Sequence, residues 1–259
     1  MKYYLYASLL IVALLAAACG GGAKEEPAKT ETEAPAAQPA APIDEATAAT
    51  VSGKVSFAGA KPAVKKIRMD AEKYCAEQHS GGAVDAEDVV VNDNGTLANV
   101  FVYVKEGLGD RTFPVPSQAV TLDQKGCMYT PHVVGVMAGQ PVEVANSDGT
   151  THNIHPQPKN NPEWNISQPP KAENISKAFA REELMIPVKC NVHPWMKSYI
   201  GVVKHPFFAV TGKDGSFTIK GLPPGEYTVA AWHEKYGTVE QKVTVAAKEA
   251  KTVDFCIQG

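Results

Sequence analysis

Short apolar runs separated by turn residues make up most of the chain from Val51 onward. The runs have strand length, and Gly-containing or Pro-containing turns such as Asn94-Gly95, Asp148-Gly149 and Asp214-Gly215 lie between them. We expect strands at Val51–Phe57, Val89–Val91, Val100–Val104, Val133–Met137, Val142–Ala145, Ile200–Val203, Phe207–Val210, Phe217–Ile219, Tyr227–Ala231 and Val239–Val245. Helical pattern is confined to residues 70–78 and 181–184. This spacing predicts an all-β protein built from sandwiches rather than βαβ units.

The first residues have the pattern of an export signal. Lys2 precedes an apolar run over residues 3–18, which is too short to span a membrane and ends in small residues before Cys19. Residues 15–19, Leu-Ala-Ala-Ala-Cys, resemble a bacterial lipobox with Ala16 at the usual leucine position. The resemblance implies that residues 1–19 are a lipoprotein signal peptide and that Cys19 is lipidated. An ordinary cleaved signal is the alternative.

Residues 20–50 have the composition of a tether. They are nearly all Gly, Ala, Pro, Glu, Thr and Lys, and Ile43 is the one large apolar side chain. Such a segment buries too little to order itself, so we expect a disordered linker. Together with the signal, it predicts a lipid-anchored protein of the bacterial cell envelope that faces the periplasm or the exterior.

The length and net charge of the chain limit which kinds of partner are expected. The chain has 259 residues, 44% of them hydrophobic, and a formal net charge of −3 at pH 7. It is long enough for one full core or two small ones. Its charge provides no basic surface for phosphate backbones, so nucleic acid is not expected as a partner. We also expect a monomer.

The candidate chemistry is concentrated in two segments. Residues 190–196 read Cys-Asn-Val-His-Pro-Trp-Met, and residues 151–155, about forty positions upstream, read Thr-His-Asn-Ile-His. Two imidazoles, one thiolate and a weak thioether are the ligands of mononuclear electron-transfer copper. A tight loop between two strands would bring three of these ligands to one point.

These motifs resemble the cupredoxins of the plastocyanin and amicyanin type, which are type 1 blue copper proteins with a Greek-key β-sandwich. The resemblance covers about residues 118–205 and implies that His152, Cys190, His193 and Met196 bind one copper ion that cycles between Cu(I) and Cu(II). It implies that Asn153 ties the two ligand loops together. His155 is an alternative to His152, because both flank one short strand.

In this family the loop histidine reaches the surface through an apolar patch. The resemblance therefore implies that redox protein partners dock near His193, with Pro194 and Trp195 in the patch. It departs from the family at Asn191 and in a Pro-rich excursion over residues 156–170.

A second resemblance lies in the C-terminal part. Residues 211–229, with Asp214-Gly215 and a Pro-Pro-Gly turn, resemble the carboxypeptidase-regulatory-like β-sandwich, which has a transthyretin-like shape, and residues 51–57 resemble its opening strand. We expect residues 51–117 with 206–259 to form this sandwich, with the copper domain 118–205 inserted. A single merged sandwich is the alternative.

The other cysteines and histidines leave alternatives open. Cys75 and Cys127 form a disulfide, remain free thiols, or join His79 and His132 in a second metal site. We interpret Cys256 as a buried small hydrophobe. His205 and His233 are expected to be surface or capping residues rather than ligands.

Three functions are compatible with these patterns. The first is a one-electron carrier between redox partners, and the second is a copper chaperone or storage lipoprotein without a role in electron transfer. The third, a copper enzyme, needs a second copper with its own histidines, and no histidine pair adjoins Cys190. We therefore expect a non-enzymatic copper protein.

Overall fold

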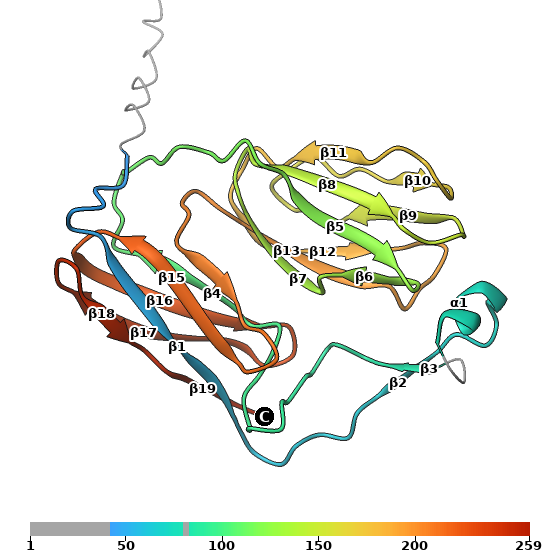
Figure 1. Cartoon of the computed structure of the whole chain (residues 1–259), viewed down its shortest axis with the longest axis horizontal. Helices are drawn as coiled ribbons and strands as arrows, with labels where there is room; N and C mark the ends of the chain where they lie inside the picture. The colour runs from blue at the N-terminus through green and yellow to red at the C-terminus, as the bar shows by residue number, and fades with distance from the viewer. Residues whose placement is uncertain (1–41, 80–82) are drawn as a thin grey trace, which may run out of the picture. The chain divides into compact units, whose positions relative to one another are not determined.

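The computed structural model describes residues 42–79 and 83–259, and its strands confirm the all-β prediction (Figure 1). The signal peptide, Cys19 and most of the predicted tether lie outside the described residues. Ala49 and Thr50, which the sequence assigns to the tether, belong to the first strand. Among the described residues, no helix is long and apolar enough to cross a membrane.

The first sandwich consists of two sheets from the two ends of the described chain. One sheet has the order β15-β1-β18, with β19 also paired to β1, and the other has the order β14-β4-β16-β17. The bounds are β1 Ala49–Ala58, β4 Phe101–Glu106, β14 Phe208–Val210, β15 Ser216–Leu222, β16 Gly225–His233, β17 Gly237–Val245, β18 Ala250–Thr252 and β19 Phe255–Gln258. Buried Val, Phe and Ile side chains of both sheets form one core cluster.

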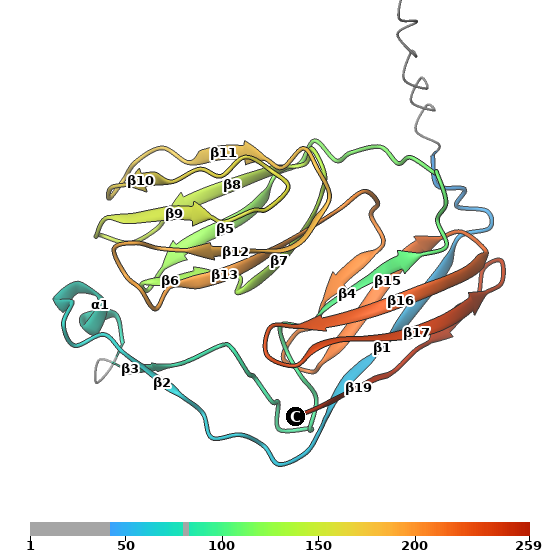
Figure 2. The ribbon, with the colours of Figure 1, turned by 180° about the vertical axis from the view of Figure 1, so that it is seen from behind.

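The opening and closing segments of the chain pair directly in this sandwich (Figure 2). Strand β1 runs antiparallel to β15, with Val51 opposite Ile219. It also runs parallel to β18 and β19, with Val55 opposite Phe255. Residues about 200 positions apart thus share one sheet.

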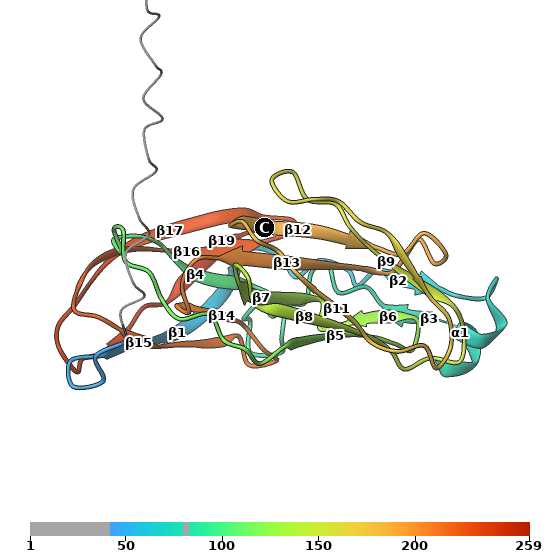
Figure 3. The same cartoon turned by 90° about the horizontal axis from the view of Figure 1, so that it is seen from above.

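The second sandwich is formed by the middle of the chain. Its sheets have the orders β10-β9-β12-β13-β7 and β11-β8-β5-β6, which Figure 3 shows as two layers. The bounds are β5 Val120–Lys125, β6 Met128–Thr130, β7 Val133–Met137, β8 Pro141–Asn146, β9 His152–Pro156, β10 Ile166–Gln168, β11 Ile175–Ala178, β12 Glu183–Lys189 and β13 Lys197–Val203. A second core cluster fills it and includes Cys190 and Met196.

An excursion from the first sandwich reaches the second. It contains β2 (Lys66–Arg68), the helix α1 (Lys73–Gln78) and β3 (Ala83–Asp85), and we call its described residues, 66–79 and 83–85, the arm. Although the arm lies between β1 and β4 in sequence, Met69 and Cys75 are fully buried in the core of the second sandwich. The apolar positions of the arm therefore have their partners in the middle of the chain.

A third apolar cluster contains side chains from both sandwiches. Phe101 and Tyr103 of β4 are buried together with Val133 of β7 and Val203 of β13. Gly135 makes this approach feasible, because an added Cβ would lie 2.5 Å from a ring carbon of Phe208. The contact leaves no room for a side chain at that position.

The strand and helix expectations differ from the structure in several places. Residues 89–91 are not a strand, and only Val91 forms an isolated bridge, to Leu97. The predicted helix at 181–184 is wrong, because β12 begins at Glu183 and its side chain accepts hydrogen bonds from the backbone of residues 159–161. The predicted helix at 70–78 is shorter in the structure, at Lys73–Gln78.

Candidate metal centre

Two segments bring the predicted ligands together at one end of the second sandwich. His152 is the first residue of β9, and Cys190 directly follows β12. The loop from Cys190 to Met196 closes on itself, because the Met196 N–H donates to the His193 carbonyl at 2.9 Å and the Cys190 N–H to the Met196 carbonyl at 3.3 Å. This closure holds Cys190 and His193 on the side that faces His152.

Three of the predicted ligand side chains converge. The Nδ1 atoms of His152 and His193 are 2.9 Å apart, and the sulfur of Cys190 is 4.0 Å from Nδ1 of His193. Their ligand atoms lie within 4.8 Å of one another, and all three residues are at most 2% exposed. Bonds of about 2 Å from one central ion would span such separations. Met196 is fully buried in the same core cluster as Cys190.

Asn153 links the two ligand segments. Its side-chain oxygen accepts hydrogen bonds from the backbone N–H groups of Asn191 at 2.5 Å and Val192 at 3.3 Å. Asn165 in turn accepts a bond from the Asn153 side-chain amide at 2.6 Å. Asn153 therefore anchors the loop of residues 190–196 to β9.

His155 lies outside the cluster. Its Nε2 pairs with Glu163 at 2.5 Å and its Nδ1 lies 3.2 Å from the side-chain oxygen of Asn191. His152 is fully buried, whereas His155 points to the other side of β9. The structure thus places only the first histidine of the pair among the candidate ligands.

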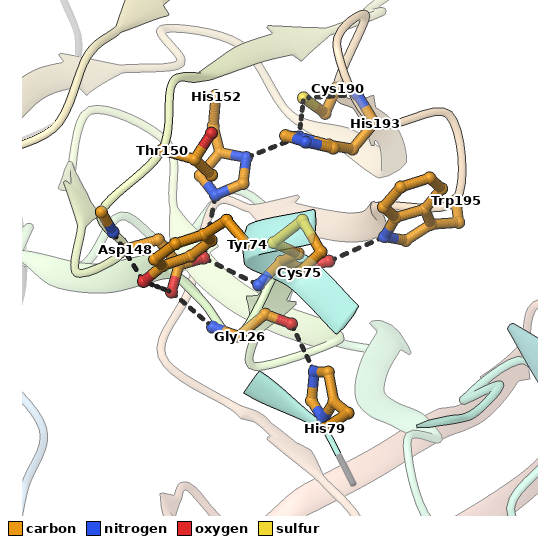
Figure 4. The surroundings of a disulfide bond; sticks show 12 residues. Tyr74, Cys75, His79, Gly126, Asp148, Thr150, His152, Cys190, His193 and Trp195 are labelled. Carbon is orange, nitrogen blue, oxygen red and sulfur yellow. Dashed lines mark hydrogen bonds and ion pairs between the residues drawn. A yellow bond between two sulfur atoms is a disulfide. The ribbon is translucent and has the colours of Figure 1, made fainter. Parts of the chain in front are cut away.

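Asp148 is a functional candidate that the sequence reading treats only as part of a turn. Its Oδ2 lies 2.8 Å from Nε2 of His152 (Figure 4). Its two carboxylate oxygens also accept the backbone N–H groups of Gly126 and Cys127, both at 2.7 Å. The sequence signal that could have indicated this contact is the position of the aspartate, four residues before a candidate histidine ligand.

The arm covers this part of the site. Cys75 of α1 and Cys127 form a disulfide, and their sulfurs lie within 4.8 Å of a ring nitrogen of His193. The Tyr74 hydroxyl accepts the Gly149 N–H at 2.6 Å, and His79 bonds to the Gly126 carbonyl at 2.7 Å. In Figure 4, Tyr74 lies next to Asp148, Cys75 lies below His193, and His79 lies next to Gly126.

His193 is consequently not a surface residue. It is 1% exposed, whereas the resemblance implies a loop histidine at the surface. The Trp195 ring lies 5.1 Å from the His193 ring, and its N–H donates to the Cys127 carbonyl at 3.0 Å. The expectation of an exposed His193 is wrong, because the disulfide and Trp195 cover the ring.

The surroundings shift the pKa values of the candidate ligands. Burial by itself raises the pKa of the Cys190 thiol, but hydrogen bonds from His152 and from nearby backbone N–H groups outweigh it and leave this pKa below its usual value. Burial and the neighbouring His152 lower the pKa of His193. A thiolate and a neutral imidazole are the forms that bind soft metal ions.

The pKa values of His152 and Asp148 are shifted in opposite directions. Burial by itself lowers the pKa of His152, but the hydrogen bonds to Asp148 and Cys190 outweigh it, so this pKa is raised. Burial by itself raises the pKa of Asp148, yet the bonds from His152, Cys127 and Gly126 lower it overall. The pair is thus an ionised carboxylate against a histidine ring.

The remaining cysteines and histidines have other partners. Because Cys75 and Cys127 form a disulfide and His132 pairs with Glu234 at 3.2 Å, these residues form no second metal site. Cys256 is a free, exposed cysteine on β19, so its predicted burial is wrong. His205 and His233 are buried, at 7% and 2% exposure, rather than at the surface. Each of these two accepts a backbone N–H through Nδ1, as a capping residue does.

A family model matches part of the chain. Residues 202–258 match the carboxypeptidase regulatory-like domain, which agrees with the C-terminal resemblance. The matched residues supply strands of the first sandwich. No curated protein matches the chain in a sequence comparison.

Solved structures similar to this chain include a copper-containing nitrite reductase, amicyanin variants and a purple cupredoxin. A Cu-containing nitrite reductase from Thermus scotoductus SA-01 has 20% identity and a TM-score of 0.32, over 36% of this chain and 24% of its own. A Cu(I) variant of amicyanin has 23% identity and a TM-score of 0.29, over 34% of this chain and 85% of its own. A purple cupredoxin from Nitrosopumilus maritimus has 19% identity and a TM-score of 0.28, over 32% of this chain and 98% of its own.

The comparisons differ in how much of each relative they cover. The chain spans about a quarter of the length of the nitrite reductase, at 24%. Each likeness covers only about a third of this chain.

Proposed function

We propose that the protein is a mononuclear type 1 copper protein that carries one electron between redox partners. The observation that carries this proposal is the meeting of the Cys190 sulfur with the Nδ1 atoms of His152 and His193 in a buried cluster. One thiolate with two imidazoles is a ligand set that suits copper in both oxidation states. Met196, buried in the same core, would supply the weak fourth ligand.

The residues around the cluster fit a site that changes little between oxidation states. When bound, copper would supply a reversible one-electron couple. Asn153 ties β9 to the ligand loop, Asp148 holds His152, and the loop is closed by its own backbone hydrogen bonds. Ligands held in this way have little freedom to rearrange, which favours fast electron transfer.

We propose that redox protein partners dock near His193, over the surface formed by Trp195 and the arm. His193 itself is covered, so an electron would leave through the groups in contact with it. Trp195 is half-buried, and its ring contacts His193. The electron would thus still leave through the loop of residues 190–196. The partner would bind to Trp195 and the arm, which cover His193, and not to His193 itself.

We further propose a lipid-anchored, exported, monomeric protein. The Cys75–Cys127 disulfide supports export, because disulfides persist in oxidising compartments such as the bacterial periplasm. The pairing of β1 with β15, β18 and β19 supports a copper module of residues 118–205 inserted into a sandwich of residues 51–117 and 206–259.

An enzymatic role finds less support. Within residues 42–79 and 83–259, every group of candidate metal ligands shares residues with this one cluster or with the adjoining disulfide. A copper enzyme of the nitrite reductase kind needs a second copper. We therefore propose a non-enzymatic carrier.

The test of the carrier function is a pair of measurements on the copper-loaded full chain. Voltammetry should show one reversible one-electron couple, and a Cu(I) chelator should remove copper slowly because the cluster is buried. Fast loss of copper to the chelator without a reversible couple would instead support the chaperone or storage function and overturn the carrier proposal.

A further inference from the structure

The Asp148 carboxylate has more fixed contacts than a turn residue needs. Its side chain is 2% exposed and lies 2.8 Å from Nε2 of His152. Backbone N–H groups of Gly126 and Cys127 donate to its two oxygens, both at 2.7 Å, and Cys127 is tied to the arm by the disulfide. The Tyr74 hydroxyl lies 3.5 Å from Oδ1 (Figure 4). The carboxylate therefore cannot turn away from His152.

This contact determines which nitrogen of His152 is available. Both oxygens of Asp148 already accept backbone N–H groups, so the carboxylate acts as an acceptor toward His152 as well. In the neutral His152 ring, Nε2 therefore carries the proton and donates a hydrogen bond to Oδ2. The lone pair is then on Nδ1, the atom that lies 2.9 Å from Nδ1 of His193. Carboxylates and carbonyls that bind the distal nitrogen of a metal-binding histidine fix its tautomer and its ring orientation.

The contact also places a negative charge next to the site. The carboxylate is buried, so solvent screens it weakly, and it favours the more positive oxidation state of a bound metal ion. His155 has a similar carboxylate partner, Glu163, but this pair lies outside the cluster and the Glu163 side chain is 57% exposed. The two pairs on one strand therefore differ mainly in their distance from the candidate ligands and in burial.

We propose that Asp148 is a positioning residue that directs the Nδ1 lone pair of His152 into the site and biases the site toward Cu(II). This proposal rests on the proposed copper function. It assigns to the turn before β9 a role in tuning the metal centre, and it gives the arm a purpose, since the arm and its disulfide hold the N–H groups that fix Asp148.

The experiment compares the wild-type full chain with Asp148→Asn and Asp148→Ala, and uses Glu163→Gln as the matched control. The first readout is nitrogen NMR of the His152 ring in the metal-free protein. At a pH high enough for the ring to be neutral, the wild type should show one tautomer with the proton on Nε2, and Asp148→Ala should show a mixture. Glu163→Gln should leave the His152 spectrum unchanged.

The second readout is the ratio of Cu(II) to Cu(I) affinity. Loss of the hydrogen-bond partner of a metal-binding histidine typically changes metal affinity 10–100-fold. Because the lost negative charge weakens the binding of Cu(II) more than that of Cu(I), Asp148→Asn should lower this ratio about 10-fold. For a one-electron couple, this corresponds to a reduction potential about 59 mV higher. Glu163→Gln should change the ratio less than about twofold, because its carboxylate is remote from the cluster and screened by solvent.

The outcomes separate the two proposals. A single Nε2–H tautomer in Asp148→Ala, together with an unchanged affinity ratio in Asp148→Asn, would overturn the role of Asp148 while copper binding stands. If the wild type bound no copper, the copper function would fail, and the tautomer measurement would still decide whether Asp148 orients His152. Urea unfolding of each variant identifies any that fails to fold, and Asp148→Asn, which keeps the side-chain shape, then carries the test.

Discussion

Cys75 and Cys127 are separated by 52 positions in the sequence and form a disulfide whose sulfurs lie within 4.8 Å of a ring nitrogen of His193. One of the two cysteines comes from the arm and the other from the turn between β5 and β6. The bond thus fastens a segment that begins in one sandwich onto the candidate metal centre of the other.

Removal of the disulfide should destabilise the second sandwich without removing a ligand. The bond closes a loop of 52 residues, for which the chain-entropy model gives about 4 kcal/mol of stabilisation. The double variant Cys75→Ser with Cys127→Ser should therefore unfold at lower urea concentration. It should still bind copper, but release it faster to a Cu(I) chelator because the cover over His193 is loosened.

The exposed free thiol provides the control for that experiment. Cys256→Ser should leave both the unfolding midpoint and the release rate unchanged, because Cys256 is on the surface of β19. Copper release from the double variant at the wild-type rate would mean that the arm does not limit access to the site.

The two histidines of β9 should differ sharply in their importance. His152→Ala removes one of the three converging side chains, so copper affinity should fall by more than about 100-fold, beyond the typical effect of an outer-shell partner. His155→Ala should change affinity by less than about threefold, because His155 pairs with Glu163 away from the cluster. Competition with a copper chelator measures both, and the reverse order would reassign the ligand to His155.

Gly135 provides a stability prediction for the apolar contact of β7. A Cβ at this position would lie 2.5 Å from Phe208 and 2.6 Å from Phe101, so Gly135→Ala should cost about 1–3 kcal/mol through overpacking. At Gly212 the nearest atom to an added Cβ is 3.9 Å away, so Gly212→Ala should be nearly neutral. Urea denaturation of both variants tests this, and equal stability of the two would contradict the close packing.

His205 should make the protein less stable in mild acid. Burial lowers the pKa of His205 from 6.5 to about 4, so between these values the unfolded chain binds a proton that the folded chain does not. Stability therefore falls as the pH drops through this window, by about 1.4 kcal/mol per pH unit for this group, and above pH 6.5 the group has no effect.

The variant His205→Asn tests this pH dependence. Its side-chain oxygen can still accept the Phe207 N–H that Nδ1 accepts at 3.2 Å. The stability difference between the variant and the wild type should change in favour of the variant between pH 6.5 and 4, as measured by denaturant unfolding. A difference that stays constant over this range would show that His205 titrates normally.

The sequence predicted the strands that have their own apolar runs and the candidate ligands that lie in short motifs. Strand β7 has the predicted bounds, Val133–Met137, because its apolar run is a local feature. The cluster of His152, Cys190 and His193 likewise follows from two motifs that are short in sequence. The strands that sequence missed, such as β10 and β11, have polar or exposed positions and owe their conformation to pairing with β9 and β8. Tertiary pairing overrides a weak local preference in such segments.

The contacts of the arm depend on the tertiary structure and could not be predicted from spacing. Asp148 reads as a turn residue because its partners, Gly126, Cys127 and His152, are brought together only by folding. The burial of His193 likewise depends on Cys75, which is more than a hundred positions away in the sequence. The motifs predicted the meeting of His152, Cys190 and His193, and the structure shows what covers His193.

The most direct test of the central claim is the visible absorption and EPR of the copper-loaded full chain, with Cys190→Ser as the comparison. The account predicts an intense thiolate-to-copper band and a narrow copper hyperfine splitting in the wild type, both lost in the variant. A wild-type protein that binds copper without this band, or a band that survives in Cys190→Ser, would contradict a copper site built on the Cys190 thiolate.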